Sequence, residues 1–288
     1  GGAAPADGRV DHAAYLAWSD AVQTPAELGQ YTCADDEPAE SEDCGAADPA
    51  ALAVAVPGSK SLSNRVLLLC AMSGGVSRIQ GLLQSQDTQV MLASLRQMGV
   101  EMEWEQGEKV LRIQGNSGNF KIPDSGLYMN NAGTAARFLA ATICIIRDQA
   151  QEKYLDSPEN GDPEPVSEKS IFLTGSERMQ KRPIADLVDC LIAAGADVTY
   201  AGKRGCLPLS VRPRARAVRG GELVLGAAVS SQYVSAVLLA APAMGTHCMV
   251  TLDVSRGKAV SLPFVRMTVE GMRSMGVDVR EIKPHEAV

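Results

Sequence analysis

The sequence predicts an α/β fold in which one helix-and-strand unit occurs three times. The segments "LRQMGVEMEW", "LIAAGADVTY" and "MRSMGVDVRE" each end an apolar-periodic helix at a glycine and pass directly into an alternating strand. Glycine just past the last turn is a common helix stop, and period 2 after period 3.6 marks the change to a strand. Gly99, Gly195 and Gly276 are 96 and 81 residues apart. Removing one insertion of about two dozen residues nearly equalises these spacings, as duplication predicts.

Composition divides the chain into an acidic leader and a mildly basic body. The whole chain carries a net charge of −7, yet residues 10–59 hold ten acids and no Lys or Arg, which leaves residues 60–288 at +3. We interpret residues 1–50 as an acidic leader or interdomain linker and residues 51–288 as one lobe. The polar stretch 147–170 separates two apolar segments and is predicted to be an exposed insertion loop. The third unit stops soon after its first strand, so we expect it to be truncated.

Several classes of function are disfavoured by the residues present. Aromatic residues make up 4% of the chain and form no stacking platform beside basic residues, so nucleic-acid binding is not expected. His12, His247 and His285 lack metal-ligand spacing, and we expect no metal. Seven scattered cysteines without a C-x-x-C pair favour a reducing compartment. No apolar run is long enough to span a bilayer, so we expect no membrane partner and a cytoplasmic location, with a plastid as the alternative.

The segment "VPGSKSLSNRVLLLC" predicts a helix from about Ser61 to Met72 with a polar, basic N-terminus. It is not a nucleotide phosphate loop, because Ser59 separates Gly58 from Lys60. Two interpretations remain open: a capped helix with a solvated polar face, or an anion site made by free N–H groups, the helix dipole and two cations. The polar side carries Lys60, Ser61, Asn64 and Arg65.

Two more segments predict helices with polar or basic entries. In "MNNAGTAARFLAATICII", Asn131, Gly133 and Thr134 precede an apolar stripe, and Gly133 is either a plain N-cap or a point where a ligand approaches the backbone. Arg137 lies one turn into the predicted helix. Three roles remain open for it: a surface residue, a member of an ion pair, or a ligand contact. In "GSERMQKRPIADLVDCLIAAG", Pro183 is predicted at the first helical position behind three cations, which oppose the helix dipole unless an anion joins them. Those cations are Arg178, Lys181 and Arg182.

Hydroxyl and amide groups open two further predicted helices. Ser230, Ser231 and Gln232 begin "SSQYVSAVLLAAP", and Ser261 stands ahead of Pro263 in "AVSLPFVRMTVEGM". Each alone is most often a cap. Five polar or basic helix starts in a lobe built from repeats could instead converge on one small polyanion.

These motifs together resemble the 5-enolpyruvylshikimate-3-phosphate (EPSP) synthase family over about residues 52–283. The motifs are "PGSKSLSNR", "NAGTAARF", "RMQKRPIADLVD" and "SSQYVSAVLLAAP". Their amino-acid sequences are most similar to the EPSP synthase section of AROM polypeptides. The resemblance implies two lobes, each an inside-out α/β barrel of three β-α-β-α-β-β units. This chain would be the first lobe with its third unit cut, and the second lobe would be mostly absent.

The resemblance also implies a reaction: the 5-hydroxyl of shikimate 3-phosphate attacks C2 of phosphoenolpyruvate, C3 is protonated, and phosphate leaves. It implies no cofactor, glyphosate as an inhibitor, and the second lobe and other AROM domains as partners. Lys60 and Arg178 would be catalytic. Motif positions assign Lys60, Asn131, Gly133, Thr134 and Arg178 to phosphoenolpyruvate. They assign Ser61, Arg65, Ser230, Ser231, Gln232, Ser261 and Phe264 to shikimate 3-phosphate.

Some residues depart from the family pattern. Phe264 replaces the usual Tyr, Asn130 replaces a Gly, and Gln86 stands where two acids commonly adjoin. The acid and base that the family places on its second lobe have no counterpart, so we expect this chain alone to be inactive. Two rivals stay open: the related transferase acting on UDP-N-acetylglucosamine, and a non-catalytic lobe that binds shikimate phosphate or nothing.

Overall fold

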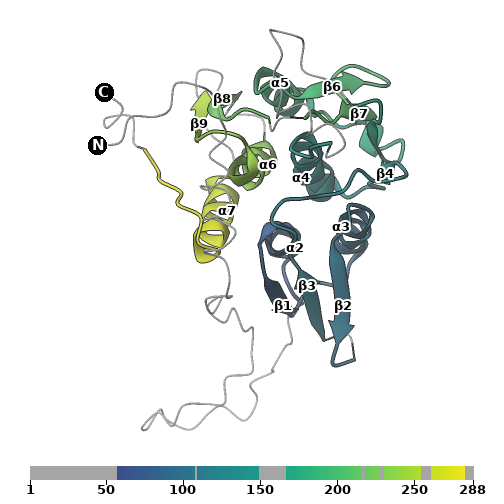
Figure 1. Ribbon diagram of the computed structural model, residues 1–288, viewed down its shortest axis with the longest axis vertical. Helices are drawn as coiled ribbons and strands as arrows, with labels where there is room; N and C mark the ends of the chain where they lie inside the picture. The colour runs from purple at the N-terminus through teal and green to yellow at the C-terminus, as the bar shows by residue number, and fades with distance from the viewer. Residues whose placement is uncertain are drawn as a thin grey trace, which may run out of the picture.

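The computed structural model describes residues 57–107, 109–148, 167–215, 218–226, 230–253 and 261–282 (Figure 1). The acidic leader at 1–50 and most of the predicted insertion loop, residues 149–166, lie outside the described residues. The described parts contain α-helices and short strands in alternation, which confirms the α/β class.

The first part of the chain forms a helix pair and an antiparallel sheet. Strand β3 is central in the order β1-β3-β2 and pairs antiparallel with both neighbours. Helix α3 begins with a capping box, in which the Ser85 hydroxyl accepts from the Thr88 backbone N–H and Thr88 Oγ1 accepts from the Ser85 N–H. The elements are α2 (Lys60–Met72), β1 (Val76–Gln80), α3 (Gln86–Gln97), β2 (Glu101–Glu105) and β3 (Val110–Gln114).

The second part has the same arrangement with one more strand. Its sheet has the order β4-β5-β7-β6, in which β4 and β5 are parallel and the other two pairs are antiparallel. Its elements are β4 (Leu127–Tyr128), α4 (Gly133–Cys144), β5 (Ile171–Thr174), the 3-10 helix η2 (Met179–Lys181), α5 (Ala185–Ala193), β6 (Asp197–Tyr200) and β7 (Leu209–Arg212).

In the third part, two parallel strands alternate with two helices. All six residues of β8 pair in register with β9. The elements are β8 (Gly221–Gly226), α6 (Ser231–Ala240), the 3-10 helix η3 (Ala241–Ala243), β9 (Cys248–Asp253) and α7 (Leu262–Ser274).

The three predicted glycine stops are confirmed, whereas the prediction of a strand after the third glycine is wrong. Gly99, Gly195 and Gly276 have φ of +86°, +96° and +84°, the left-handed region that glycine enters without a Cβ clash. Strands β2 and β6 follow the first two. Residues 277–282 form no strand, because no described segment pairs with them and an extended chain needs a neighbour for its hydrogen bonds.

The predicted start of α5 also differs from the structure. Pro183 is not its first residue: α5 begins at Ala185 with Ile184 as N-cap, and Pro183 forms an isolated bridge with Cys206. The Ile184 N–H donates to the Gly205 carbonyl at 2.9 Å. This tertiary contact holds Ile184 outside the helical conformation, with φ −146° and ψ 4°, so the helix starts later than proline alone suggests.

The helices lie between the sheets, and the core sits among them. Figure 1 shows α2, α4 and α6 in the middle with the three sheets around them. Every residue of α4 is buried, including Phe138 and the polar Arg137, so this helix packs centrally. By contrast, α7 buries only Thr268 and Met272. The N-terminal ends of α2, α4, α6 and α7 meet around one pocket.

Candidate anion-binding site

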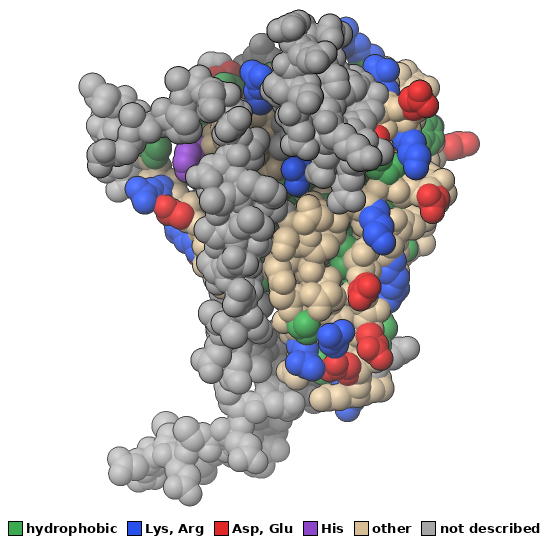
Figure 2. All heavy atoms as spheres, in the orientation of Figure 1, with side chains coloured by type: hydrophobic (Ala, Val, Ile, Leu, Met, Phe, Trp, Pro, Cys, Tyr) green, Lys and Arg blue, Asp and Glu red, His purple; other side chains and the backbone are tan. Residues whose placement is uncertain are grey.

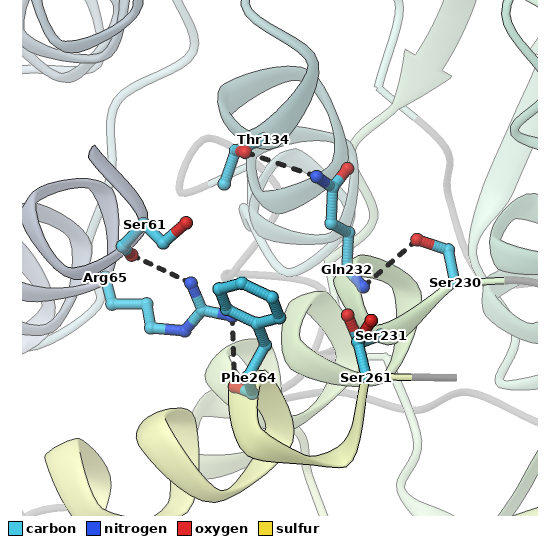
Figure 3. Close-up of a pocket in the computed structure, with 8 residues that line it drawn as sticks. All are labelled: Ser61, Arg65, Thr134, Ser230, Ser231, Gln232, Ser261 and Phe264. Atoms are coloured by element: carbon cyan, nitrogen blue, oxygen red, sulfur yellow. Dashed lines mark hydrogen bonds between the residues drawn. The ribbon is translucent and has the colours of Figure 1, made fainter. Parts of the chain in front are cut away.

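A pocket of about 260 Å³ opens among the N-terminal ends of four helices (Figure 3). Side chains from α2, α4, α6 and α7 and their cap positions line it, and none of them is acidic. They are Ser61, Arg65, Thr134, Ser230, Ser231, Gln232, Ser261 and Phe264. The structure therefore brings together all seven residues that the motifs assigned to shikimate 3-phosphate, with Thr134 from the other predicted set.

Arg65 is the only cation in this lining, and its guanidinium is held by neutral acceptors. Nε donates to Thr268 Oγ1 at 2.7 Å, and Nη1 donates to the Ser61 carbonyl at 2.8 Å. Nη2 donates to Ser235 Oγ at 2.9 Å and to the Phe264 carbonyl at 3.1 Å. A guanidinium has five N–H donors, so one donor on Nη1 has no acceptor among the described residues.

The charge on Arg65 has no carboxylate partner in the described parts of the chain, although the residue is only 3% exposed. Its guanidinium lies 5.2 Å from the Phe138 ring centroid and 6.0 Å from that of Phe264. Burial lowers the pKa of Arg65 to about 10, which leaves it cationic at neutral pH. The solvated-face interpretation of α2 is therefore wrong for Arg65 and also for Asn64, which is fully buried.

The hydroxyl and amide groups differ in what they bind locally. Ser230 caps α6 by accepting from the Gln232 N–H at 3.2 Å, and Gln232 Nε2 donates to Thr134 Oγ1 at 3.4 Å. Ser261 precedes α7 with φ +57° and makes no side-chain cap. Its hydroxyl therefore does not serve the helix, which differs from the capping role expected of a serine at this position.

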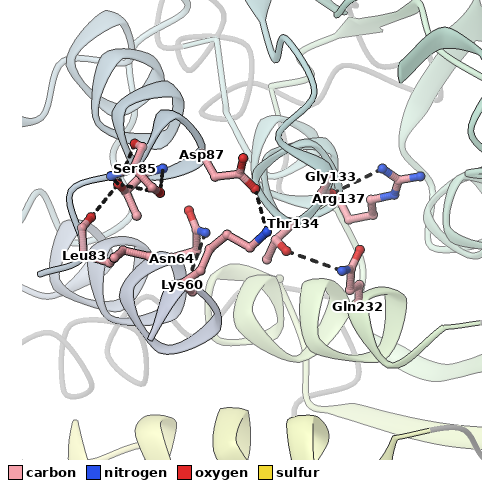
Figure 4. A network of polar contacts seen from close by, with 10 residues as sticks. Lys60, Asn64, Leu83, Ser85, Asp87, Gly133, Thr134, Arg137 and Gln232 are labelled. Atoms are coloured by element: carbon pink, nitrogen blue, oxygen red, sulfur yellow. Dashed lines mark hydrogen bonds and ion pairs between the residues drawn. The ribbon is translucent and has the colours of Figure 1, made fainter. Parts of the chain in front are cut away.

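The remaining predicted residues lie outside this lining. Lys60 Nζ forms a 3.2 Å ion pair with Asp87 in the first turn of α3 (Figure 4). Asn131 Oδ1 accepts from Ser176 Oγ at 2.6 Å. Asn130 has φ +47°, a conformation that asparagine tolerates better than most residues, so this departure from glycine is accommodated.

Arg178, Lys181 and Arg182 are exposed and have no ion-pair partner within the described residues. Arg178 is the N-cap of η2 rather than of a long helix. The Arg182 guanidinium lies against Gly133 at the start of α4. The cation cluster therefore sits beside the N-terminus of α4 through Arg182.

The sequence did not identify how the segment carrying these cations is held in place. Buried Arg137 donates to the carbonyls of Gly133 (3.3 Å) and Pro183 (2.8 Å), and Tyr233 Oη also donates to Pro183 at 2.6 Å. Burial, with a smaller contribution from Arg182, lowers the pKa of Arg137. Of the three roles open for Arg137, a surface position and an ion pair are wrong, since it is buried and its partners are two carbonyls and the Met179 sulfur. The only indication of a special role for Arg137 in the sequence was its place in the motif "NAGTAARF".

Other site types find no support in the described residues. No group of His, Cys, Asp and Glu there could hold a metal ion. No described helix is both long and apolar enough to cross a membrane. On the face seen in Figure 2, acidic and basic side chains are interspersed rather than gathered by sign.

Comparison with known proteins agrees with the motifs. A family model described as EPSP synthase (3-phosphoshikimate 1-carboxyvinyltransferase) matches residues 47–288. The chain is 41% identical over 235 residues to a pentafunctional AROM polypeptide of Malassezia globosa, covering 81% of this chain and 14% of that protein. It is 38% identical over 227 residues to that of Pneumocystis carinii, covering 78% and 13%.

Solved structures give the same relationship. An EPSP synthase from Acinetobacter baumannii superposes with a TM-score of 0.53 at 27% identity, covering 65% of this chain and 37% of that one. A second structure of EPSP synthase from this organism gives 0.53 at 28% identity. The chain thus spans about a seventh of the length of the two AROM polypeptides and little more than a third of the length of the two solved EPSP synthase chains. Residues of three of the four motifs line one pocket. Because the EPSP synthase family model also matches residues 47–288, the chain belongs to the EPSP synthase family.

Proposed function

We propose that this chain contributes the shikimate 3-phosphate half of an EPSP synthase active site. The observation that carries the proposal is Arg65: a buried cation without a described carboxylate partner, one N–H donor free, in a pocket otherwise lined by hydroxyls, an amide and a ring. A buried uncompensated charge is costly. An anionic ligand that also presents hydroxyl groups would offset this cost.

The reaction is transfer of the enolpyruvyl group of phosphoenolpyruvate to the 5-hydroxyl of shikimate 3-phosphate. The hydroxyl oxygen bonds to C2, its proton leaves, and a proton adds to C3. The resulting tetrahedral intermediate then loses phosphate and a C3 proton to give EPSP. We assign phosphoenolpyruvate to Lys60, Asn131, Gly133, Thr134 and Arg178, of which Thr134 lines the pocket. Cations and free N–H groups stabilise the charge on a phosphate or carboxylate.

The domain organisation belongs to the same proposal. We assign residues 51–288 to a first lobe of three β-α-β-α-β-β units. In support, the described elements of residues 127–212 follow this order, and β8, α6, β9 and α7 follow its first four steps. Residues 1–50 would then be a leader or a linker from another AROM domain. A second lobe, which the family resemblance implies, would complete the site. Five free cysteines among the described residues fit a reducing compartment, such as cytoplasm or plastid.

A titration and an assay on the purified chain test this function. We expect shikimate 3-phosphate to bind weakly by calorimetry, because seven of its assigned contacts are present. We expect no phosphate release with both substrates, since an open half-site stays wet and lacks the opposing acid and base. No binding by a folded chain would support the inert-fragment rival. Tighter binding of UDP-N-acetylglucosamine would support the related transferase.

A further inference from the structure

The side chains behind Arg65 form a second layer to which the sequence analysis gave no role. Ser235 on α6 and Thr268 on α7 are both 0% exposed, and we call them the hydroxyl pair. Thr268 Oγ1 accepts from Arg65 Nε at 2.7 Å and lies 2.8 Å from Ser235 Oγ, which accepts from Arg65 Nη2 at 2.9 Å. The hydroxyl pair and the guanidinium thus form a closed triangle of hydrogen bonds.

This triangle fixes the direction of the guanidinium. Nε and Nη2 point into the protein, where their acceptors come from α6 and α7, so Nη1 is the end left for the pocket. The Phe264 carbonyl accepts from Nη2, and Thr268 Oγ1 also lies 3.0 Å from that oxygen. The pair therefore also holds the turn of α7 that carries the Phe264 ring over Arg65.

The chemical type of the partners matters as much as their geometry. Buried arginines are usually paired with carboxylates, which satisfy the N–H groups and also cancel the charge. Hydroxyl oxygens satisfy the N–H groups but leave the positive charge in place. A carboxylate at either position would hold the guanidinium equally well and would compete with an anionic ligand for its charge.

We infer that Ser235 and Thr268 are positioning residues that orient Arg65 while keeping its charge uncompensated for the anion in the pocket. The identity of that anion as shikimate 3-phosphate rests on the proposed function. The prediction that a neutral pair preserves a free cation rests on the geometry alone.

Ser235→Asp and Ser235→Asn in the full chain separate charge from packing, because these side chains have nearly the same size. We expect Ser235→Asp to melt at a higher temperature than Ser235→Asn, since its carboxylate pairs with a buried lone cation. We also expect Ser235→Asp to bind shikimate 3-phosphate at least about tenfold more weakly than Ser235→Asn by calorimetry. If the two variants bind alike, or if Ser235→Asp melts lower, the inference is wrong.

Thr268→Ser and Thr268→Val provide the matched test on α7. Thr268→Ser keeps the acceptor and should bind within about twofold of the unaltered chain, whereas Thr268→Val keeps the shape and should bind about fivefold or more weakly. Equal binding by Thr268→Val would overturn the role of Thr268. If the unaltered chain binds no shikimate 3-phosphate, the proposed function fails, while the melting order of the Ser235 variants still decides whether Arg65 is an uncompensated cation.

Discussion

The guanidinium of Arg182 occupies the space that a β-carbon on Gly133 would need. A Cβ built at residue 133 would lie 2.7 Å from Arg182 Nη2 and 2.8 Å from its Cζ, well inside van der Waals contact. The missing side chain of Gly133 therefore has a use within the protein besides any approach of a ligand. It lets a cation rest on the uncapped N-terminus of α4, although that cation opposes the helix dipole.

Gly133→Ala should alter ligand binding more than stability. The added methyl group must push aside Arg182, and the far end of a flexible side chain can move at small cost. We expect the free energy of unfolding to change by about 1 kcal/mol or less. Inhibition by glyphosate and use of phosphoenolpyruvate should both weaken, measured on a longer protein that carries the second lobe.

Arg182→Ala is the control for that substitution. If Gly133→Ala acts by displacing Arg182, the double variant should use phosphoenolpyruvate as well as Arg182→Ala alone and should be inhibited by glyphosate to the same degree. If the methyl group meets the ligand directly, the two effects should add. Unchanged inhibition in Gly133→Ala would support the plain N-cap interpretation.

Arg178→Ala should weaken use of phosphoenolpyruvate more than binding of shikimate 3-phosphate. Arg178 is exposed and lies outside the pocket that contains Arg65. Losing one charge-assisted hydrogen bond costs about 1.5 to 3 kcal/mol, or on the order of tenfold to a hundredfold. Steady-state kinetics with phosphoenolpyruvate, on a longer protein that carries the second lobe, would measure this loss. Lys181→Ala is the neighbouring control. Equal losses in both variants would mean that general charge, rather than Arg178, is responsible.

Tyr233→Phe should destabilise the fold modestly without unfolding it. The substitution removes the 2.6 Å bond to the Pro183 carbonyl but leaves Arg137 bound to the same oxygen at 2.8 Å. We expect a loss of about 0.5 to 1.5 kcal/mol in the free energy of unfolding by urea titration. Arg137→Met should cost more, because Arg137 also donates to Gly133. A larger loss for Tyr233→Phe would contradict this order.

Stability should fall as the pH rises above about 9, because buried thiols stay protonated in the fold. Burial raises the pKa of Cys70 to about 11 and of Cys144 to about 12, from 9.0. The unfolded chain therefore loses these protons first, so the stabilisation is complete below pH 9 and is lost toward these raised values. Urea titrations at pH 8 and 10.5 measure the slope. Cys144→Ala should make the fall in the free energy of unfolding between these pH values smaller. If the fall is unchanged in this variant, burial of the Cys144 thiol is not its cause.

Much of the fold and of the pocket lining could be predicted from the sequence because the signals are local. Glycines at 99, 195 and 276 stop helices wherever those helices pack, since only the backbone is involved. The resemblance to the EPSP synthase family implied the seven residues of the shikimate 3-phosphate set, and the structure gathers these residues around one pocket. Local signals failed at Pro183, where a bridge to Cys206 moved the helix start.

Tertiary structure alone decided which cations are free and which are held. Lys60, Arg65, Arg137 and Arg182 are indistinguishable as basic residues near helix starts, but the folded chain gives each a different environment. Lys60 pairs with Asp87, Arg137 donates to two carbonyls and the Met179 sulfur, and Arg65 is buried among hydroxyls. Ser235 and Thr268 are 33 residues apart and touch only after α6 packs on α7. The sequence by itself determined where helices start and stop through backbone chemistry; charge compensation depends on distances across the fold, which no local pattern encodes.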